Sequence, residues 1–137
     1  MTIPRLSNRE PIPAHLRGGV IALGNFDGFH LGHQAVAGAA RDLARAEGRP
    51  LIVATFDPHP VRHFRPDAEP FRLTTLDQRQ DIFTAFGADA MLVFHFDAAM
   101  AAMAGEDWVR RVLIDHLGIG GVAMGTGVTV QEARESL

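Results

Sequence analysis

Apolar and polar positions follow two patterns along this chain. Short, uninterrupted apolar runs predict buried strands, and longer segments with apolar residues at helical spacing predict helices. Four prolines between Asp57 and Pro70 predict an irregular loop. Each predicted helix is followed by a glycine, and Thr75 is placed to cap the second. The strands are predicted at Val20–Leu23, Leu51–Phe56, Ala90–Phe94 and Gly121–Met124, and the helices at residues 34–47, 76–86 and 106–117.

The alternation of these strands and helices indicates the fold class. Strands that are apolar on both faces are covered on both sides, which is typical of parallel sheets. We therefore expect an α/β protein with a Rossmann-like parallel sheet flanked by helices. No repeat or low-complexity segment divides the chain, so residues 1–137 are expected to form a single domain.

Polar residues suited to chemistry follow three of the predicted strands. The run Gly24–His33 follows the first strand, Asp57–Pro60 the second, and His95–Asp97 the third. Open parallel sheets bind their ligands outside the carboxyl ends of the strands. The three loops are therefore expected to face one cleft.

The first of these loops combines glycines with two histidines. Gly24, Gly28 and Gly32 would let the backbone approach phosphate oxygens, and a helix that begins at about His33 would direct its free N–H groups to the same place. An imidazole, whose reference pKa is about 6.5, can become protonated beside a polyanion and neutralise charge that develops on a leaving pyrophosphate. The loop therefore predicts a nucleotide phosphate site, at which Mg²⁺ shares the charge.

Composition argues against several other classes. The formal net charge is −3, which disfavours nonspecific nucleic-acid binding, because that binding depends on many Lys and Arg contacts to phosphates. There is no cysteine, hence neither a disulfide framework nor a thiolate metal site. No apolar run reaches the roughly 18 residues of a membrane span, and the N-terminus lacks the apolar core of a signal peptide. We expect a cytoplasmic protein that binds neither nucleic acid nor membranes.

Three motifs resemble those of a known family. The segment His30-Leu31-Gly32-His33 resembles the HxGH signature of nucleotidyltransferases, and the longer run Gly24–Gln34 resembles bacterial FAD synthetases specifically. Thr55–Pro60 is similar to the second motif of that family, and Leu73–Leu76 to its third. The resemblance continues to Gly125 and so spans nearly the whole chain.

The resemblance implies an activity and a site. Members of this family transfer AMP from ATP to FMN, giving FAD and pyrophosphate, usually with a riboflavin kinase domain attached downstream. Mg²⁺ would bind together with ATP, and protein side chains alone would not form a metal site. The catalytic residues would be Asn25, His30 and His33. The nucleotide-binding residues would be Gly24, Asn25, Phe26, Asp27, Gly28, His30, Gly32 and His33. The residues that border the flavin would be Phe56, Asp57, Pro58, His59, Pro60 and Phe64, whose proline rings and aromatics suit a flat apolar wall.

The chain departs from the family pattern near its end. After the fourth strand the family has the form Gly-x-Asn/Asp-Phe-x-Phe-Gly, whereas this chain has Gly125-Thr126-Gly127-Val128-Thr129-Val130-Gln131. The sequence stops at Leu137, before the family's later Ser/Thr-Arg motif, its last strand and the kinase domain. We therefore expect a domain truncated at its C-terminal side. Its third or fourth strand would present an edge that a second copy or another partner would cover.

Three other interpretations remain open. The departures near the end are compatible with a nucleotide- or flavin-binding remnant that no longer turns over. A different HxGH adenylyl- or cytidylyltransferase is the second alternative, although Thr55–Pro60 favours FMN as the acceptor. The third is a zinc site built from the imidazoles of His30, His33, His59 and His63.

Overall fold

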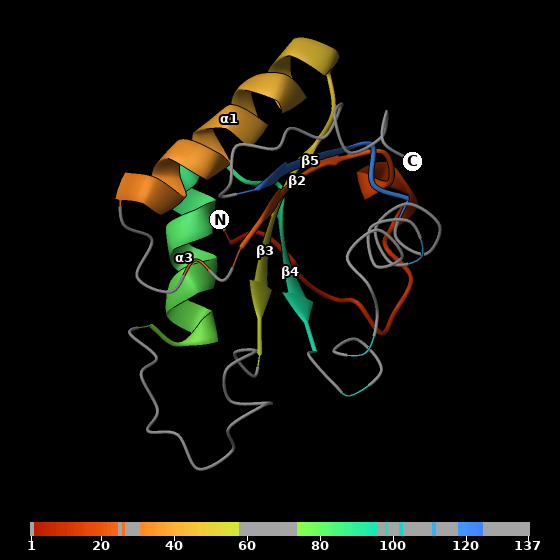
Figure 1. The fold of residues 1–137 in the computed structure, drawn as a ribbon, viewed down its shortest axis with the longest axis vertical. Helices are drawn as coiled ribbons and strands as arrows, with labels where there is room; N and C mark the ends of the chain where they lie inside the picture. The colour runs from red at the N-terminus through yellow and green to blue at the C-terminus, as the bar shows by residue number, and fades with distance from the viewer. Residues whose placement is uncertain are drawn as a thin grey trace.

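The computed structural model describes residues 2–24, 26, 31–57, 74–95, 98, 102, 111 and 118–124. Within these residues the chain forms five β-strands, two α-helices and a short 3-10 helix (Figure 1). The strands are β1 (Arg5–Ser7), β2 (Val20–Leu23), β3 (Leu51–Phe56), β4 (Ala90–Phe94) and β5 (Gly121–Met124). The helices are η1 (Ala14–Leu16), α1 (Leu31–Glu47) and α3 (Leu76–Phe86).

All strand pairs of this sheet are parallel, in the order β1-β4-β3-β2-β5. Along the chain, β2, β3 and β4 extend the sheet in one direction, and β5 then joins β2 on its other side. The strand order therefore reverses at β2, which is the kind of place where open α/β sheets bind ligands. The predicted α/β class is confirmed, and the four strands predicted from apolar runs have their predicted bounds.

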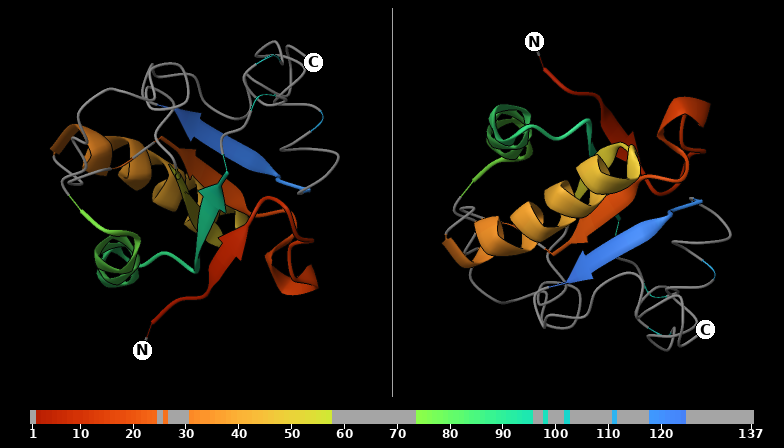
Figure 2. Two further views of the ribbon diagram at one scale, coloured as in Figure 1. Left: turned by 90° about the horizontal axis from the view of Figure 1, so that it is seen from below. Right: turned by 90° about the horizontal axis from the view of Figure 1, so that it is seen from above.

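Each face of the sheet packs against helical segments. Alternate strand residues such as Val20, Val53 and Met91 form one apolar cluster with Ala40 of α1 and Phe83 of α3. The strand residues between them form a second cluster on the other face, together with η1. Figure 2 shows α1 and α3 on one side of the sheet and η1 on the other. Burial on both faces explains why these strands carry continuous apolar runs.

α1 begins earlier than the sequence predicts. The predicted start lies at about His33, but the helix starts at Leu31, so His33 lies within its first turn. A helix start depends on what satisfies its first N–H groups, because these have no partner inside the helix. Apolar periodicity does not report on those partners, so it does not locate a helix start to the residue. The earlier start places His33 on helical backbone instead of at the edge of a loop.

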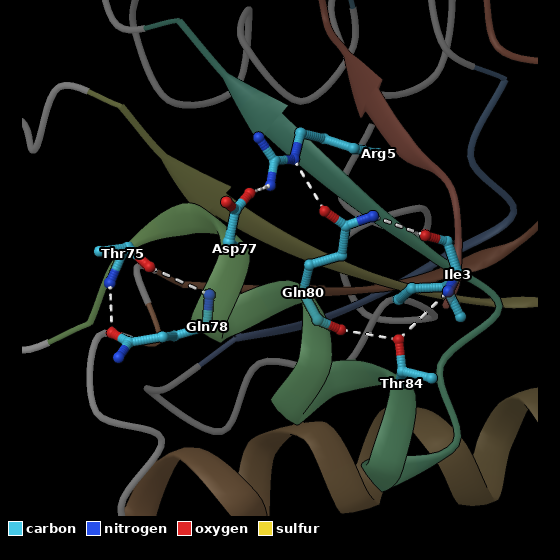
Figure 3. Close-up of polar contacts among 7 residues, drawn as sticks. All are labelled: Ile3, Arg5, Thr75, Asp77, Gln78, Gln80 and Thr84. Atoms are coloured by element: carbon cyan, nitrogen blue, oxygen red, sulfur yellow. Dashed lines mark hydrogen bonds and ion pairs between the residues drawn. The ribbon is translucent and has the colours of Figure 1, made fainter. Parts of the chain in front are cut away.

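α3 has the boundaries that its sequence predicts. Thr75 caps it: the Thr75 Oγ1 accepts from the Gln78 N–H at 3.1 Å, and the Thr75 N–H donates to Gln78 Oε1 at 2.9 Å (Figure 3). Gly87 ends the helix in the left-handed conformation, with φ of 101°. Both ends therefore follow from the chemistry of single residues that the sequence displays.

β1 is the strand that the apolar pattern misses, because Leu6 is its one apolar residue. It pairs with β4, with Arg5 opposite Met91. The segment ahead of it is fastened to α3, where the Ile3 N–H donates to Thr84 Oγ1 at 3.2 Å (Figure 3). The prediction of an open edge is therefore wrong for the third predicted strand, β4, because β1 covers it. β5 is the outer strand on the opposite side among the described residues.

Several predicted features lie largely or wholly outside the described residues. These are the helix at residues 106–117, the irregular loop at residues 57–70 beyond Asp57, and the divergent run at residues 125–131. They stay predictions.

At the amino ends of the strands, backbone segments are tightly joined. The Gly18 N–H donates to Gly118 O at 2.6 Å, and the Gly120 N–H donates to Gly19 O at 2.9 Å. A Cβ on Gly120 would lie closer to the Gly18 carbonyl oxygen than van der Waals contact allows. Position 120 therefore requires glycine for close approach. The described residues of the first and second motifs lie at the opposite edge of the sheet.

Candidate functional site

The three strands that carry motifs end at one edge of the sheet, because β2, β3 and β4 are parallel. Phe56 and Phe94 are paired in the register, and their rings stack with centroids 5.4 Å apart and planes 28° apart. The Asp57 N–H donates to Phe94 O at 3.0 Å. The start of the second motif is thereby fixed against the strand that precedes the third loop.

A buried aromatic ring anchors the first loop. Phe26 is 1% exposed and has a φ of 53°, a conformation that costs a residue other than glycine roughly 1 kcal/mol. Burial of the ring offsets that cost. A Cβ at Gly24 would lie 3.1 Å from the Phe26 ring, so the missing side chain leaves room for the ring. Because the ring is buried, any contact of Phe26 with a ligand would come from its backbone.

His33 lies in the first turn of α1, beside this ring. Its imidazole and the Phe26 ring meet edge to face, with centroids 5.3 Å apart and planes 84° apart. His33 is half-buried, so the contact leaves part of the residue accessible. The first turn of α1 contains no acidic residue, so no carboxylate there opposes an anion at the helix N-terminus. The helix start and the imidazole together suit a phosphate group.

Only part of the predicted site falls within the described residues. The described members are Gly24, Phe26, Gly32, His33, Phe56 and Asp57. The structure places them at the carboxyl ends of β2 and β3 and at the start of α1. The others, which are Asn25, Asp27, Gly28, His30, Pro58, His59, Pro60 and Phe64, lie outside the described residues, and their roles stay predictions.

Two kinds of feature are absent from the described part of the chain. No group of three or more histidine, aspartate or glutamate side chains there could hold a metal ion. The zinc alternative draws also on His30, His59 and His63, which lie outside that part, so it stays a hypothesis. Nor does any described helix combine the length and apolar character that crossing a membrane requires.

Sequence reasoning assigned no role to two polar residues near this edge. Asn8, which follows β1, accepts a hydrogen bond from the His95 N–H through its Oδ1 at 2.9 Å. Arg79 of α3 is 1% exposed, and its Nη1 donates to Thr55 Oγ1 near the end of β3 at 2.6 Å. Asn8 gave no signal because β1 was not predicted. Arg79 follows the third motif closely, and that proximity is the signal that could have identified it.

Comparisons with known proteins agree with these motifs. A family model described as FAD synthetase matches residues 12–136. A bifunctional riboflavin kinase/FMN adenylyltransferase of Escherichia coli (strain K12) is 32% identical over 86% of this chain and 38% of its own length. A protein of the same description from Pseudomonas fluorescens is 36% identical over 78% of this chain and 34% of its own length. One from Bacillus subtilis (strain 168) is 36% identical over 69% of this chain and 30% of its own length. The chain therefore spans between 30% and 38% of the length of these three relatives.

A solved structure shares the fold. The crystal structure described as a macrolide-efflux protein from Streptococcus pneumoniae matches 98% of this chain and 47% of its own, with a TM-score of 0.74 and 18% sequence identity. At that identity the likeness concerns the fold alone, and it supports the Rossmann-like arrangement of the parallel sheet.

Proposed function

The chain belongs to the FAD synthetase family, and from this premise we propose that it transfers AMP from ATP to FMN, giving FAD and pyrophosphate. It spans 38% of the Escherichia coli relative, so the proposal concerns adenylyl transfer and leaves aside the kinase step in that relative's description. One observation carries the proposal above the others. His33 presents a half-buried imidazole from the first turn of α1, directly after the strand at which the strand order reverses.

The proposed reaction is an in-line displacement at the α-phosphorus of ATP. An oxygen of the FMN phosphate forms the new P–O bond, and the bond to the bridging oxygen breaks, so that pyrophosphate leaves with the electron pair. His33 and, by the family resemblance, His30 would neutralise the charge that develops on the leaving group. The free N–H groups of the first turn of α1 would act on the same charge. Mg²⁺ bound to ATP would share it.

The acceptor would lie at the end of β3. Phe56 is half-buried there and stacks on Phe94, which is fully buried and cannot yield without opening a cavity. A rigid aromatic surface suits the flat, largely apolar ring system of a flavin. The second motif, which the family resemblance assigns to the flavin, begins at this strand end.

The direct test is to incubate the protein with FMN, ATP and Mg²⁺ and to separate the flavins by chromatography. FAD formation supports the proposal. Binding of FMN and ATP without FAD would favour the remnant that no longer turns over. Transfer from CTP in place of ATP would favour another HxGH nucleotidyltransferase.

His33→Ala tests the residue that carries the proposal. We expect kcat to fall about 100-fold, because a donor to the leaving phosphates is lost. The melting temperature should stay close to that of the wild type, since the half-buried imidazole buries little apolar area. His15→Ala is the matched control, because His15 is an exposed histidine of η1 on the other face of the sheet. Equal losses of kcat in the two variants would contradict the assignment.

A further inference from the structure

Helix α3 contacts both the first loop, through Phe26, and the end of β3, through Thr55. Arg79 and Phe83 are one helical turn apart and therefore lie on the same face of α3. They are 1% and 0% exposed, and α3 lies on the same side of the sheet as α1 (Figures 1 and 2). Neither residue belongs to the predicted site. Their contacts are with other residues of the protein, so they can position site residues without touching substrate.

Phe83 reaches His33 through one intervening ring. The Phe83 and Phe26 centroids lie 6.1 Å apart with planes at 84°, and the Phe26 ring meets the His33 imidazole in the same edge-to-face manner. This geometry is the one that the ring quadrupoles favour. Both phenylalanine rings are buried, so neither can shift without opening a cavity. The His33 imidazole therefore packs against the Phe26 ring, which in turn packs against the Phe83 ring of α3.

Arg79 joins the end of a strand to the start of a helix. Its Nη1 donates to Thr55 Oγ1 at 2.6 Å, its Nε to Thr74 Oγ1 at 3.1 Å and its Nη2 to Thr74 O at 2.9 Å. Thr55 lies in the second motif and Thr74 in the third. One planar guanidinium therefore fixes where the chain leaves β3 relative to where it enters α3, a task for which its rigid fork of donors is suited.

We infer that α3 is the positioning helix of the candidate site. Phe83 sets the position of His33 through Phe26, and Arg79 sets the end of β3 against the start of α3. The inference rests on the proposed function, in which the first loop holds the nucleotide and the second motif borders the flavin. Phe83 therefore acts on the nucleotide side of the reaction and Arg79 on the acceptor side.

The first experiment compares Phe83→Leu with Phe86→Leu. Phe86 is the matched control because it lies on the same helix, with its ring under the Arg41 guanidinium at 4.2 Å. In the ligand-free protein, Phe83→Leu shifts the imidazole proton resonances of His33, which are identified by their loss in His33→Ala, and Phe86→Leu leaves them in place. In the FAD assay, Phe83→Leu lowers kcat about tenfold, because a misplaced group loses much of its effect. It leaves the KM for FMN within about twofold.

The second experiment compares Arg79→Met with Arg41→Met. Arg41 is the matched control, since its Nη1 donates to Phe86 O at the far end of α3. Without ligand, Arg79→Met speeds amide hydrogen exchange at Asp57 and Gln78 about tenfold relative to the amides of β2, because hydrogen bonds to a charged group are lost locally. In the assay it raises the KM for FMN about tenfold and leaves the KM for ATP unchanged.

Two milder variants cover the case in which Arg79→Met does not fold. Thr55→Val removes one acceptor and nearly keeps the volume, and Arg79→Lys keeps the charge but loses the fork. Each is expected to change the same two amides and the KM for FMN in the same direction, by a smaller factor.

The outcomes separate the inference from the proposed function. Equal movement of the His33 resonances in both phenylalanine variants overturns the role of Phe83, and exchange that rises uniformly through the sheet overturns the role of Arg79. If the His33 resonances or the Asp57 and Gln78 amides change as expected in an active protein, but kcat and the KM for FMN do not, then α3 does not act on the reaction. A wild type that makes no FAD overturns the proposed function, while the two ligand-free measurements still decide whether α3 positions His33 and the end of β3.

Discussion

Gly120 lies where two backbone segments meet at the amino edge of the sheet. We expect Gly120→Ala to lower the free energy of unfolding by about 2 kcal/mol, because the added Cβ would collide with the Gly18 carbonyl oxygen. Gly38 of α1 is the matched control, because an added Cβ there meets nothing within 4 Å. Gly38→Ala should raise the free energy of unfolding by about 0.5–1 kcal/mol. Urea unfolding of the two variants measures both values, and a loss of equal size in both would refute the argument from close approach.

Phe56 allows a test of the acceptor side at the same scale. We expect Phe56→Ala to weaken FMN binding about tenfold, because the aromatic surface at the end of β3 is lost. ATP binding should be unchanged, since the nucleotide is assigned to the first loop. Titration calorimetry with each ligand measures the two affinities. A parallel loss of both affinities would mean that the substitution disturbs the whole edge and not a flavin wall.

The sequence locates His33 and Phe56 but does not show how they are held. Phe26 was predicted to bind the nucleotide, and that role stays a prediction. The structure adds that its ring is buried against Phe83 and that its φ is positive, and neither property can be read from its neighbours in the chain. An arginine in a short helix usually predicts a solvated side chain. Arg79 can be buried in α3 because two hydroxyl groups accept its hydrogen bonds, that of Thr55 in β3 and that of Thr74 just before the helix.

Among the elements, α3 shows how a local signal sets a boundary. We expect Thr75→Ala to lower the free energy of unfolding by about 1 kcal/mol, because the Gln78 N–H loses its acceptor. Thr75→Ser should keep most of the stability, since it retains the hydroxyl group. Thermal unfolding followed by circular dichroism compares the two variants. If both unfold at the same reduced temperature, the capping box is not the source of the stability.

Element prediction succeeded where the chemistry is local and failed where partners are distant. The strands β2 to β5 are predominantly apolar, and α3 has a cap and a terminal glycine, so their bounds follow from neighbouring residues. β1 has three residues and depends on β4 for its existence. The start of α1 was misplaced because its first turn, which contains Gly32 and His33, lacks an apolar pattern.

At the scale of the whole molecule, β1 protects the edge that β4 would otherwise expose. We expect deletion of residues 2–8 to cause self-association, because unpaired N–H and C=O groups of β4 would become accessible to a second chain. Light scattering after size-exclusion chromatography measures the effect. Arg5→Ala is the control: it removes the side-chain contacts to Asp77 and Gln80 and leaves the strand backbone in place. An unchanged mass after the deletion would argue against an edge-protecting role.

The sheet class and the shared edge of the motifs were predictable, but the strand order was not. Apolar runs alternating with helices indicate a parallel sheet, and in a parallel sheet all carboxyl ends share one edge. Nothing in the apolar pattern shows that β5 joins β2 on the side away from β3. That order depends on contacts between distant segments, such as the backbone hydrogen bond from Gly18 to Gly118.

The parallel pairing of β1 with β4 has a consequence for how the chain is made. β1 leaves the ribosome before β2, β3 and β4, but its partner residues, Met91 to Val93, are added only after β2, α1 and β3. In that interval β2, α1 and β3 can form a native unit from neighbouring segments, whereas β1 has no partner and must wait. The first strand in the sequence is therefore the last of β1 to β4 that can take its place in the sheet.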